Sequence, residues 1–458
     1  MTAESGDTSD AGTGGPGDPG ADAAMEAALR GGAEPGVGED AYATMDLALR
    51  VGELMLAGGD TAEAADLAMA RLGRAYGLPH PETNVTLAAV GLSYLPRGGR
   101  PPVTAERRVR RRQPNYTRLA AIHDLVRDAV AGGLSLQQAK YGLGDIIGRR
   151  PAYPGWAQAG ALSLLGAAGA VLVGGGFVAA CAAFLATLVG DRTGAWLGRR
   201  GIADFFQMAV AAAIGTLVTV LLLAVDAPVR SGTVIVGVVI ALIPGRALVV
   251  AMQDGIAGDL VTGTTRLVEV LFLITAILSG IGAVTYVAAR QGVPISLQNL
   301  PSAPSSVAAP QTLGAAAIAA AFAVYHLVPR RWLPPVALGG MLSWGAYVEL
   351  RALDLPSAPA TFLAATLVGA LGATAARLRR VPALILVTPC VAPLMPGTLM
   401  YRGMIQLTGG NAGRGGLILV ESLATALAIG AGVYIGGELL RVVRPARRML
   451  RPRRRVGV

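Results

Sequence analysis

Residues 242–245 read Leu-Ile-Pro-Gly in the middle of one long apolar run, and residues 394–397 read Leu-Met-Pro-Gly in the middle of another. The two prolines are 152 residues apart, and the same spacing separates Glu269 from Glu421, which follow them. Two coincident spacings across hydrophobic sequence indicate an internal duplication. Because proline removes a backbone donor and clashes with the preceding helical turn, each copy predicts a broken helix.

The composition is typical of a membrane protein. Of the 458 residues, 53% are apolar and only 15% are charged, which excludes a disordered chain and is unusual for a soluble globule. The net charge of +10 is due almost entirely to arginines between the apolar blocks and in the C-terminal tail, so membrane topology explains it better than nucleic-acid binding. Cys181, Cys390 and the three histidines show no metal-ligand spacing, and neither a metal nor a cofactor is expected.

Residues 41–155 have the mixed, amphipathic pattern of a small α+β domain, which we place in the cytoplasm. Its first helix is expected over 41–58. A second helix is expected to run to about Tyr76, with Asp60 as its N-cap and Glu63 completing a capping box.

The rest of this domain is expected to hold a hairpin and two more helices. A strand over 85–95 is predicted to pair with a partner over 103–112, because both runs are bounded by turn residues. One helix is expected to start at Asn115 or Thr117, and Ser135 is expected to cap the next.

Ten apolar segments after this domain approach the length of about 20 residues that a membrane-spanning helix requires. Arginines are concentrated in alternate loops, so the positive-inside rule places both termini in the cytoplasm. The expected fold class is therefore a polytopic, multi-pass α-helical protein of the cytoplasmic (inner) membrane with ten transmembrane helices. The spans are expected at 156–174, 175–190, 202–225, 231–252, 266–289, 311–329, 332–351, 359–378, 381–401 and 415–440.

With five spans in each half, the second half must cross the membrane in the opposite sense to the first. Two inverted five-helix repeats with matched broken helices are typical of secondary transporters. The predicted segments are a disordered tail (1–40), the cytoplasmic α+β domain (41–155), the first five-helix half (156–290), a linker loop (291–310), the second five-helix half (311–441) and a basic cytoplasmic tail (442–458).

Charged residues near the two breaks are the candidates for chemistry. Glu269 and Glu421 lie inside predicted spans, where carboxylates often mark a proton path, although each is only a few residues from the expected start of its helix and solvation at the interface is the alternative. Asp254 and Asp259 are expected in the inner loop after the first break, where they could bind a cationic amine or shape a gate; two turn-forming aspartates are the alternative.

Arginines next to the breaks suit an acidic group. Arg246 follows the first Pro-Gly directly and Arg402 lies shortly after the second, so either could form bidentate hydrogen bonds with a substrate carboxylate. The full set of candidate substrate- and ion-binding residues is Pro244, Gly245, Arg246, Asp254, Asp259, Glu269, Pro393, Pro396, Gly397, Tyr401, Arg402 and Glu421.

An ordered run of motifs extends through both halves of the chain. It comprises Gly52 to Met55, Gly58 to Thr61, Ala75 to Leu78, Arg118 to Val126, residues 242–245, Asp254 to Asp259 with Arg266 and Glu269, and Pro389 to Gly397 with Tyr401. In this run the chain resembles the threonine/serine exporter family. The resemblance implies a cytoplasmic N-terminal domain, ten spans, export of amino acids driven by the proton-motive force, and halves that can exist as separate subunits.

The partners expected on this basis are a small amino-acid substrate, protons and membrane lipids. A homo-oligomer is left open, and no nucleic acid or enzymatic activity is expected. Two alternatives remain at this stage: an exporter of dicarboxylates such as succinate, and a membrane sensor whose cytoplasmic domain binds a ligand. A membrane-embedded hydrolase is a weaker third, because no Ser/His/Asp set is visible from spacing.

Overall fold

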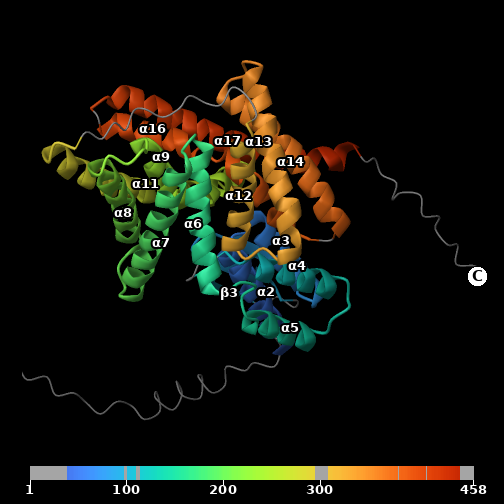
Figure 1. The fold of residues 1–458 in the computed structure, drawn as a ribbon. Coiled ribbons are helices and arrows are strands. Elements are labelled where there is room, and N and C mark those ends of the chain that lie inside the picture. The colour runs from blue at the N-terminus through green and yellow to red at the C-terminus, as the bar shows by residue number, and fades with distance from the viewer. Residues whose placement is uncertain are drawn as a thin grey trace, which may run out of the picture.

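A computed structural model describes residues 39–96, 101–109, 114–293, 308–379, 381–408 and 410–443. The predicted tail 1–40, the linker 291–310 and the basic tail 442–458 therefore lie almost wholly outside the described residues. In Figure 1 the N-terminal domain, in blue and teal, lies below the ends of α12 and α14, whereas α16 and α17, in red, lie along the opposite edge.

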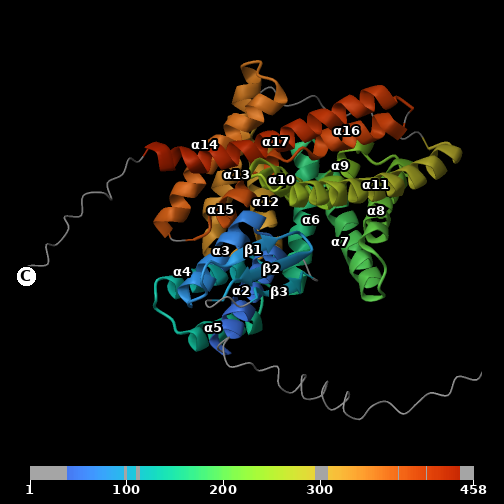
Figure 2. The same cartoon turned by 180° about the vertical axis from the view of Figure 1, so that it is seen from behind.

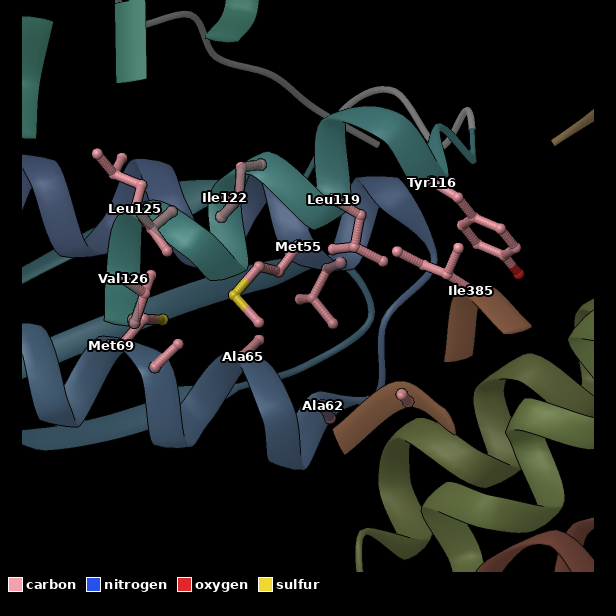
Figure 3. Close-up of a cluster of buried hydrophobic side chains, with 14 of the residues drawn as sticks. Met55, Ala62, Ala65, Met69, Tyr116, Leu119, Ile122, Leu125, Val126 and Ile385 are labelled. Carbon is pink, nitrogen blue, oxygen red and sulfur yellow. The ribbon is translucent and has the colours of Figure 1, made fainter. Parts of the chain in front are cut away.

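The N-terminal domain contains a three-stranded antiparallel sheet of order β1-β2-β3 and four helices, of which α2 and α3 pack on the sheet, α4 packs on α2 and α3, and α5 packs on α2 and α4. Its core is formed by apolar side chains at helical spacing, among them Met55 of the first helix and Met69 of the second, both fully buried (Figure 3). Its elements are α2 (Glu39–Gly58), α3 (Ala62–Ala75), β1 (Glu82–Val85), β2 (Ala89–Tyr94), β3 (Val103–Arg108), α4 (Tyr116–Val130) and α5 (Leu136–Gly148).

Most predicted helix ends in this domain are confirmed, but one cap is wrong. Asn115 caps α4 and Ser135 caps α5 through a complete capping box. The N-cap of α3 is Thr61, whose side-chain oxygen accepts a hydrogen bond from the amide of Ala64 at 3.2 Å. Asp60 does not cap the helix in the predicted box, because its carboxylate is engaged by His123 instead, at 2.7 Å.

The predicted strand over 85–95 is also corrected. The chain reverses at Thr86, whose amide donates to Ala89 O at 2.8 Å, so this segment contributes to two strands instead of one. The earlier strand, β1, was missed because the reversal carries no glycine or proline. The predicted pairing with the segment at 103–112 is confirmed, since β2 and β3 pair with Tyr94 opposite Val103.

The remaining described chain is helical. It contains six helices that are long and apolar enough to cross a membrane, or up to eight spans if each of two bent pairs counts as one. The six are α6 (Gly155–Leu172), α7 (Phe177–Arg199), α8 (Asp204–Ala224), α11 (Leu260–Arg290), α14 (Ser357–Arg379) and α17 (Ala412–Val443).

The bent pairs contain the two predicted breaks. The other elements are α9 (Ser231–Leu242), α10 (Gly245–Ile256), α12 (Ala309–Tyr325), the 3₁₀ turn η1 (Arg330–Trp332), α13 (Leu333–Ala352), α15 (Ala383–Cys390), the 3₁₀ turn η2 (Ala392–Leu394) and α16 (Gly397–Thr408). Helices α12 and α13 occupy the predicted spans 311–329 and 332–351, but neither is among the six long apolar helices.

The duplication extends to whole elements. Helices α9, α10 and α11 begin at Ser231, Gly245 and Leu260, and α15, α16 and α17 each begin 152 residues later. Packing partners repeat as well, because α8 packs against α11 and α14 packs against α17. Figure 2, from behind, shows α10 and α11 running alongside α16 and α17.

Two tight helix crossings also recur at the 152-residue spacing. A Cβ atom added at Gly280 of α11 would lie 2.0 Å from the carbonyl oxygen of Ala209, and one added at Gly432 of α17 would lie 2.5 Å from that of Phe362. The two glycines are 152 residues apart. Small residues at such crossings let helix backbones approach closely, as is common between membrane helices.

Candidate functional site

The helix breaks have the same local geometry in both halves. The amide of Gly245 donates to Ile243 O and the amide of Gly397 donates to Met395 O, both at 2.7 Å, in a turn that spans the proline. The chain bends by 50° at the first break and by 43° at the second. The predicted interruptions are thus present as tight turns between short helices.

The fold brings the two breaks into contact with each other. A Cβ atom at Gly245 would lie 2.6 Å from the sulfur of Met395, and one at Gly397 would lie 3.0 Å from the side chain of Ile240 in α9. Each break is therefore packed against the other half of the duplicated chain. No sequence pattern within one half could have shown this.

A cavity of about 290 Å³ lies beside the second break. This volume is at the lower end of the range of about 300 to 1,000 Å³ that is usual for small-molecule sites. We call it the Pro393 cavity. Its polar and broken-helix lining consists of Gln311, Trp344, Tyr347, Arg351, Ser357, Thr361, Pro393, Pro396, Thr398, Arg402, Glu421 and Thr425.

The Pro393 cavity gathers four of the predicted site residues and not the others. Pro393, Pro396, Arg402 and Glu421 line it. Tyr401 is fully buried in the apolar packing around α16 instead. The predicted residues that do not line it are Pro244, Gly245, Arg246, Asp254, Asp259, Glu269, Gly397 and Tyr401.

The cavity wall carries charges of both signs. The hydroxyl of Ser357 donates to a carboxylate oxygen of Glu421 at 2.6 Å. Arg351 donates from one terminal nitrogen to the carbonyl of Leu355. Arg402 provides a second cation on the wall. An anion and two cations so close together suit a ligand that itself carries both charges.

Three polar atoms on the wall are buried without a hydrogen-bond partner among the described residues. They are the indole nitrogen of Trp344, Nε of Arg351 and the amide oxygen of Gln311. Buried polar groups are nearly always paired, so three unpaired ones on residues that line one cavity indicate a ligand or ordered water. None of the three residues could be predicted from the sequence as part of the site, because tertiary packing alone brings them to the cavity.

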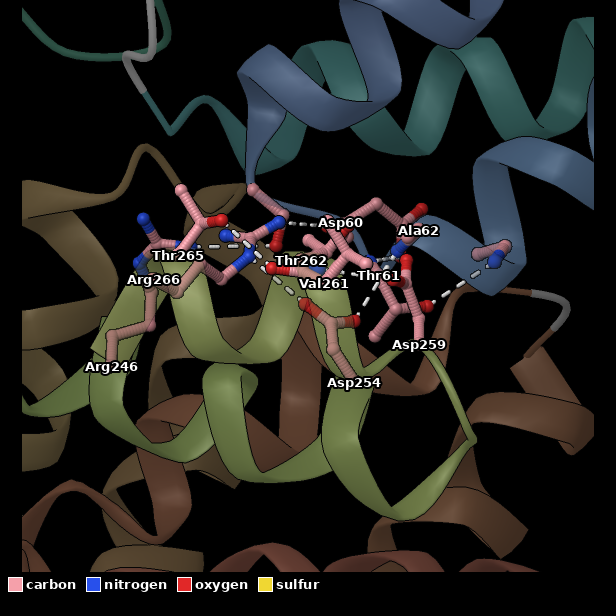
Figure 4. A network of polar contacts seen from close by, with 12 residues as sticks. Asp60, Thr61, Ala62, Arg246, Asp254, Asp259, Val261, Thr262, Thr265 and Arg266 are labelled. Atoms are coloured by element: carbon pink, nitrogen blue, oxygen red, sulfur yellow. Dashed lines mark hydrogen bonds and ion pairs between the residues drawn. The ribbon is translucent and has the colours of Figure 1, made fainter. Parts of the chain in front are cut away.

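A second polar group lies where the N-terminal domain meets α10 and α11 (Figure 4). We call it the docking cluster; it comprises Asp60, Arg246, Asp254 and Arg266 with the backbone of Gly59 and Ala62. Nε of Arg266 lies 2.9 Å from Asp254 Oδ2, and both side chains are nearly fully buried.

Backbone groups of the turn between α2 and α3 complete the docking cluster. The amide of Ala62 donates to Asp254 Oδ1, Arg246 donates to Gly59 O, and Arg266 donates to Asp60 O, each at 3.4 Å. Arg246, predicted to bind a substrate carboxylate, therefore contacts the N-terminal domain and not the Pro393 cavity.

The positions expected for three acidic candidates are corrected. Asp254 lies in α10, not in a loop, because that helix continues to Ile256. Asp259 is the N-cap of α11 and accepts a hydrogen bond from the amide of Thr262 at 3.0 Å. Because α11 begins at Leu260, Glu269 lies in its third turn and not near the helix start; it is exposed.

The N-terminal domain also docks on the end of α12. The amides of Tyr116 and Thr117 donate to the carbonyls of His326 and Leu327 at 3.0 and 3.1 Å. Tyr116 stacks on the His326 ring with centroids 5.6 Å apart, and burial raises the pKa of its phenol, which therefore stays protonated at neutral pH. Figure 3 shows Tyr116 beside Ile385 of α15, where the core of the domain continues into the helical part.

The Pro393 cavity and the docked domain lie at opposite ends of α12. Gln311, at the start of this helix, lines the cavity, and His326, at its C-cap, contacts the domain. At 1.5 Å per residue, the two positions are about 22 Å apart along the helix. Among the described residues, no group of three or more His, Cys, Asp or Glu side chains could hold a metal ion.

Comparisons with known proteins match both halves of the chain. Residues 46–288 match a family described as "Putative threonine/serine exporter", and residues 311–437 match one described as "Threonine/Serine exporter, ThrE". The chain is 32% identical over 407 residues to a probable threonine/serine exporter of Mycobacterium tuberculosis, covering 86% of this chain and 75% of that protein. It is 29% identical to a threonine/serine exporter of Corynebacterium glutamicum over 424 residues, covering 90% and 84%. No solved structure matches the chain significantly.

Proposed function

The chain belongs to the threonine/serine exporter family, and from this premise we propose that it exports threonine and serine across the cytoplasmic membrane. The similarity to named exporters supports export of an amino acid. Threonine and serine as the substrates of this chain, and the proton-motive force as the driving force, are our proposal.

The observation that carries this proposal is the Pro393 cavity. It combines a broken helix, in which Pro393 and Pro396 have no amide to donate, with Glu421 and two arginines on its wall. Substrate sites of secondary transporters commonly form at such interrupted helices. A cavity of about 290 Å³ suits a small amino acid better than a large one.

We further propose ten spans in two inverted repeats, with both termini in the cytoplasm. Supporting this are the recurrence of elements at 152 residues and the concentration of arginines in alternate loops. In this orientation the N-terminal domain is cytoplasmic, and the Pro393 cavity lies toward the outer end of the pathway. The docking cluster then closes the inner end and must open once per transport cycle.

Protons are proposed to enter through the acidic residues of the helical part. Carboxylates within spanning segments are costly and commonly take part in proton transfer. Glu421 on the cavity wall, Glu269 on α11 and Asp254 in the docking cluster are the candidates. Asp254 stands apart from the other two, because its ion pair with Arg266 must be broken or reformed when the inner end opens.

The test is efflux from proteoliposomes that contain the full chain and are loaded with labelled threonine, with and without an imposed proton gradient. Threonine efflux that the gradient accelerates is the expected result, and serine should compete. Labelled succinate in parallel vesicles is the comparison. Succinate efflux without threonine efflux would assign the site to dicarboxylates, and no efflux of either from correctly inserted protein would overturn the exporter.

A further inference from the structure

Resting on the proposed function, we infer that the Pro393 cavity binds the amino acid in one fixed orientation. Its α-carboxylate lies against Trp344 and Arg351, and its ammonium group lies against Glu421. Trp344 and Arg351 are not among the site residues that the sequence predicts. Each carries a buried donor without a hydrogen-bond partner among the described residues.

Trp344 is 7% exposed, and its indole nitrogen has no hydrogen-bond partner among the residues that the structure describes. An indole N–H can only donate, so the missing partner must be an acceptor. Leaving such a buried donor unpaired destabilises the folded protein. Trp344 therefore combines two properties: it lines the cavity, and it carries a buried donor without a partner in the described chain.

Arg351 lies seven residues after Trp344 on α13, which places the two side chains on the same face two turns apart. One terminal nitrogen of Arg351 is fixed by the carbonyl of Leu355, which orients the guanidinium. Its Nε is buried without a partner in the described chain. A carboxylate offers acceptor oxygens for both donors, and a charge-assisted bond to arginine is stronger than a neutral one.

Other residues of the cavity lining provide acceptors. Glu421 accepts one hydrogen bond from Ser357, and an ionised carboxylate can accept about four, so capacity remains for an ammonium group. The buried amide oxygen of Gln311 is another acceptor without a partner among the described residues. An amine or ammonium can donate to both, whereas a second carboxylate could donate to neither.

The chemistry of the wall therefore favours a zwitterion over a dicarboxylate. A dicarboxylate would place its second negative charge near Glu421 and leave the oxygen of Gln311 unpaired. Trp344 and Tyr347 form an aromatic part of the wall with ring centroids 5.6 Å apart, and the cavity volume of about 290 Å³ limits the size of the side chain that can be accommodated. A short hydroxylated side chain fits these limits.

The test uses threonine transport by full-length variants in proteoliposomes, with two competing probes. Threonine methyl ester retains the ammonium group but has no carboxylate charge, and 3-hydroxybutyrate retains the carboxylate but has no amine. The variants are Trp344→Phe, Arg351→Lys and Glu421→Gln. Matched controls are Trp156→Phe and Arg290→Lys, which change exposed residues outside the cavity.

Trp344→Phe and Arg351→Lys should each raise the KM for threonine by about tenfold, the effect of losing one hydrogen bond to a charged group. The ester should inhibit both variants as strongly as it inhibits the wild type. It has no carboxylate that could accept charge-assisted hydrogen bonds from these two donors. Glu421→Gln should weaken inhibition by the ester and leave inhibition by 3-hydroxybutyrate unchanged. The two controls should match the wild type.

The inference fails if wild-type protein transports threonine and both Trp344→Phe and Arg351→Lys retain its KM. It also fails if Trp344→Phe and Arg351→Lys weaken inhibition by the ester as much as they weaken threonine binding. A wild-type protein that transports no threonine would instead overturn the proposed function. Each variant is first checked for a monodisperse profile in detergent, and Trp344→Phe, which nearly conserves volume, remains informative if Arg351→Lys does not fold.

Discussion

Asp254 and Arg266 form an ion pair across the turn between α10 and α11, with 2.9 Å between Oδ2 and Nε and side-chain exposures of 1% and 6%. Removing one partner of a buried pair leaves the other charge without compensation, which typically costs about 3 to 5 kcal/mol. We therefore expect Asp254→Asn to lower the midpoint of thermal unfolding in detergent by several degrees. The double variant Asp254→Asn/Arg266→Met should recover part of the loss.

The matched control for this prediction is Asp145→Asn in α5. Asp145 pairs with Arg149 at 2.7 Å, but both side chains are more than 60% exposed. Exposed pairs contribute about 1 kcal/mol at most. Equal unfolding midpoints for Asp254→Asn and Asp145→Asn would show that the buried pair between α10 and α11 does not stabilise the fold.

A methyl group at Gly280 should disrupt the crossing of α11 and α8. Its Cβ would lie 2.0 Å from a backbone oxygen of Ala209, which cannot move without shifting the helix. Overpacking of this kind costs about 1 to 3 kcal/mol or more. Gly280→Ala should therefore reduce the yield of monodisperse protein and lower its unfolding midpoint.

The same helix supplies the control. Gly282 has open space around its added Cβ, so Gly282→Ala should be neutral or slightly stabilising through helix propensity. Gly432→Ala, at the position 152 residues after Gly280, should reproduce the Gly280→Ala defect. A harmless Gly432→Ala would argue that the two crossings are not equivalent.

Pro396→Ala tests whether the second break is needed. Proline is less favourable than alanine inside a helix by about 3 kcal/mol, so the substitution removes much of the preference for an interrupted helix. We expect the rate of threonine efflux to fall by about tenfold or more, with normal membrane insertion. Pro334→Ala is the comparison, since Pro334 lies in the first turn of α13, where proline is compatible with a helix. Equal efflux from the two variants would contradict a role for the break.

Glu269→Gln tests proton coupling apart from substrate binding, because Glu269 lies outside the Pro393 cavity. In this variant a proton gradient should accelerate threonine efflux much less than in the wild type. The KM for threonine and the rate of threonine exchange without a gradient should be unchanged. Glu349→Gln, on the exposed side of α13, serves as the control. Full gradient-driven efflux by Glu269→Gln would remove this residue from the coupling path.

Local chemistry was enough to predict some features from the sequence. The Pro-Gly breaks follow from the missing amide of proline, and the 152-residue repeat is visible because both copies retain it. Asn115 and Ser135 could be assigned as caps because capping depends on residues only three positions away. The four predicted residues on the cavity wall all lie in or after the second break.

What could not be predicted depends on contacts between distant segments. Arg246 was assigned to a substrate because it follows a break, but α10 directs it to Gly59 in another domain. Asp254 and Arg266 are twelve residues apart, and they meet only because the chain reverses at Gly258, where φ is +98°. Trp344 occurs in an apolar helix like any other, and only the packing of α13 against the second break reveals its buried donor.

The N-terminal domain contacts both copies of the duplicated unit at once. It bonds to Arg246 and Arg266 in the first copy and, through the backbone of Tyr116 and Thr117, to the end of α12 in the second. A polypeptide cut between the copies would still be joined by this non-covalent bridge. Two fragments, one ending and the other beginning within residues 294–307, should therefore reassemble when they are co-expressed. The fragment that carries the N-terminal domain should retain the other fragment through purification.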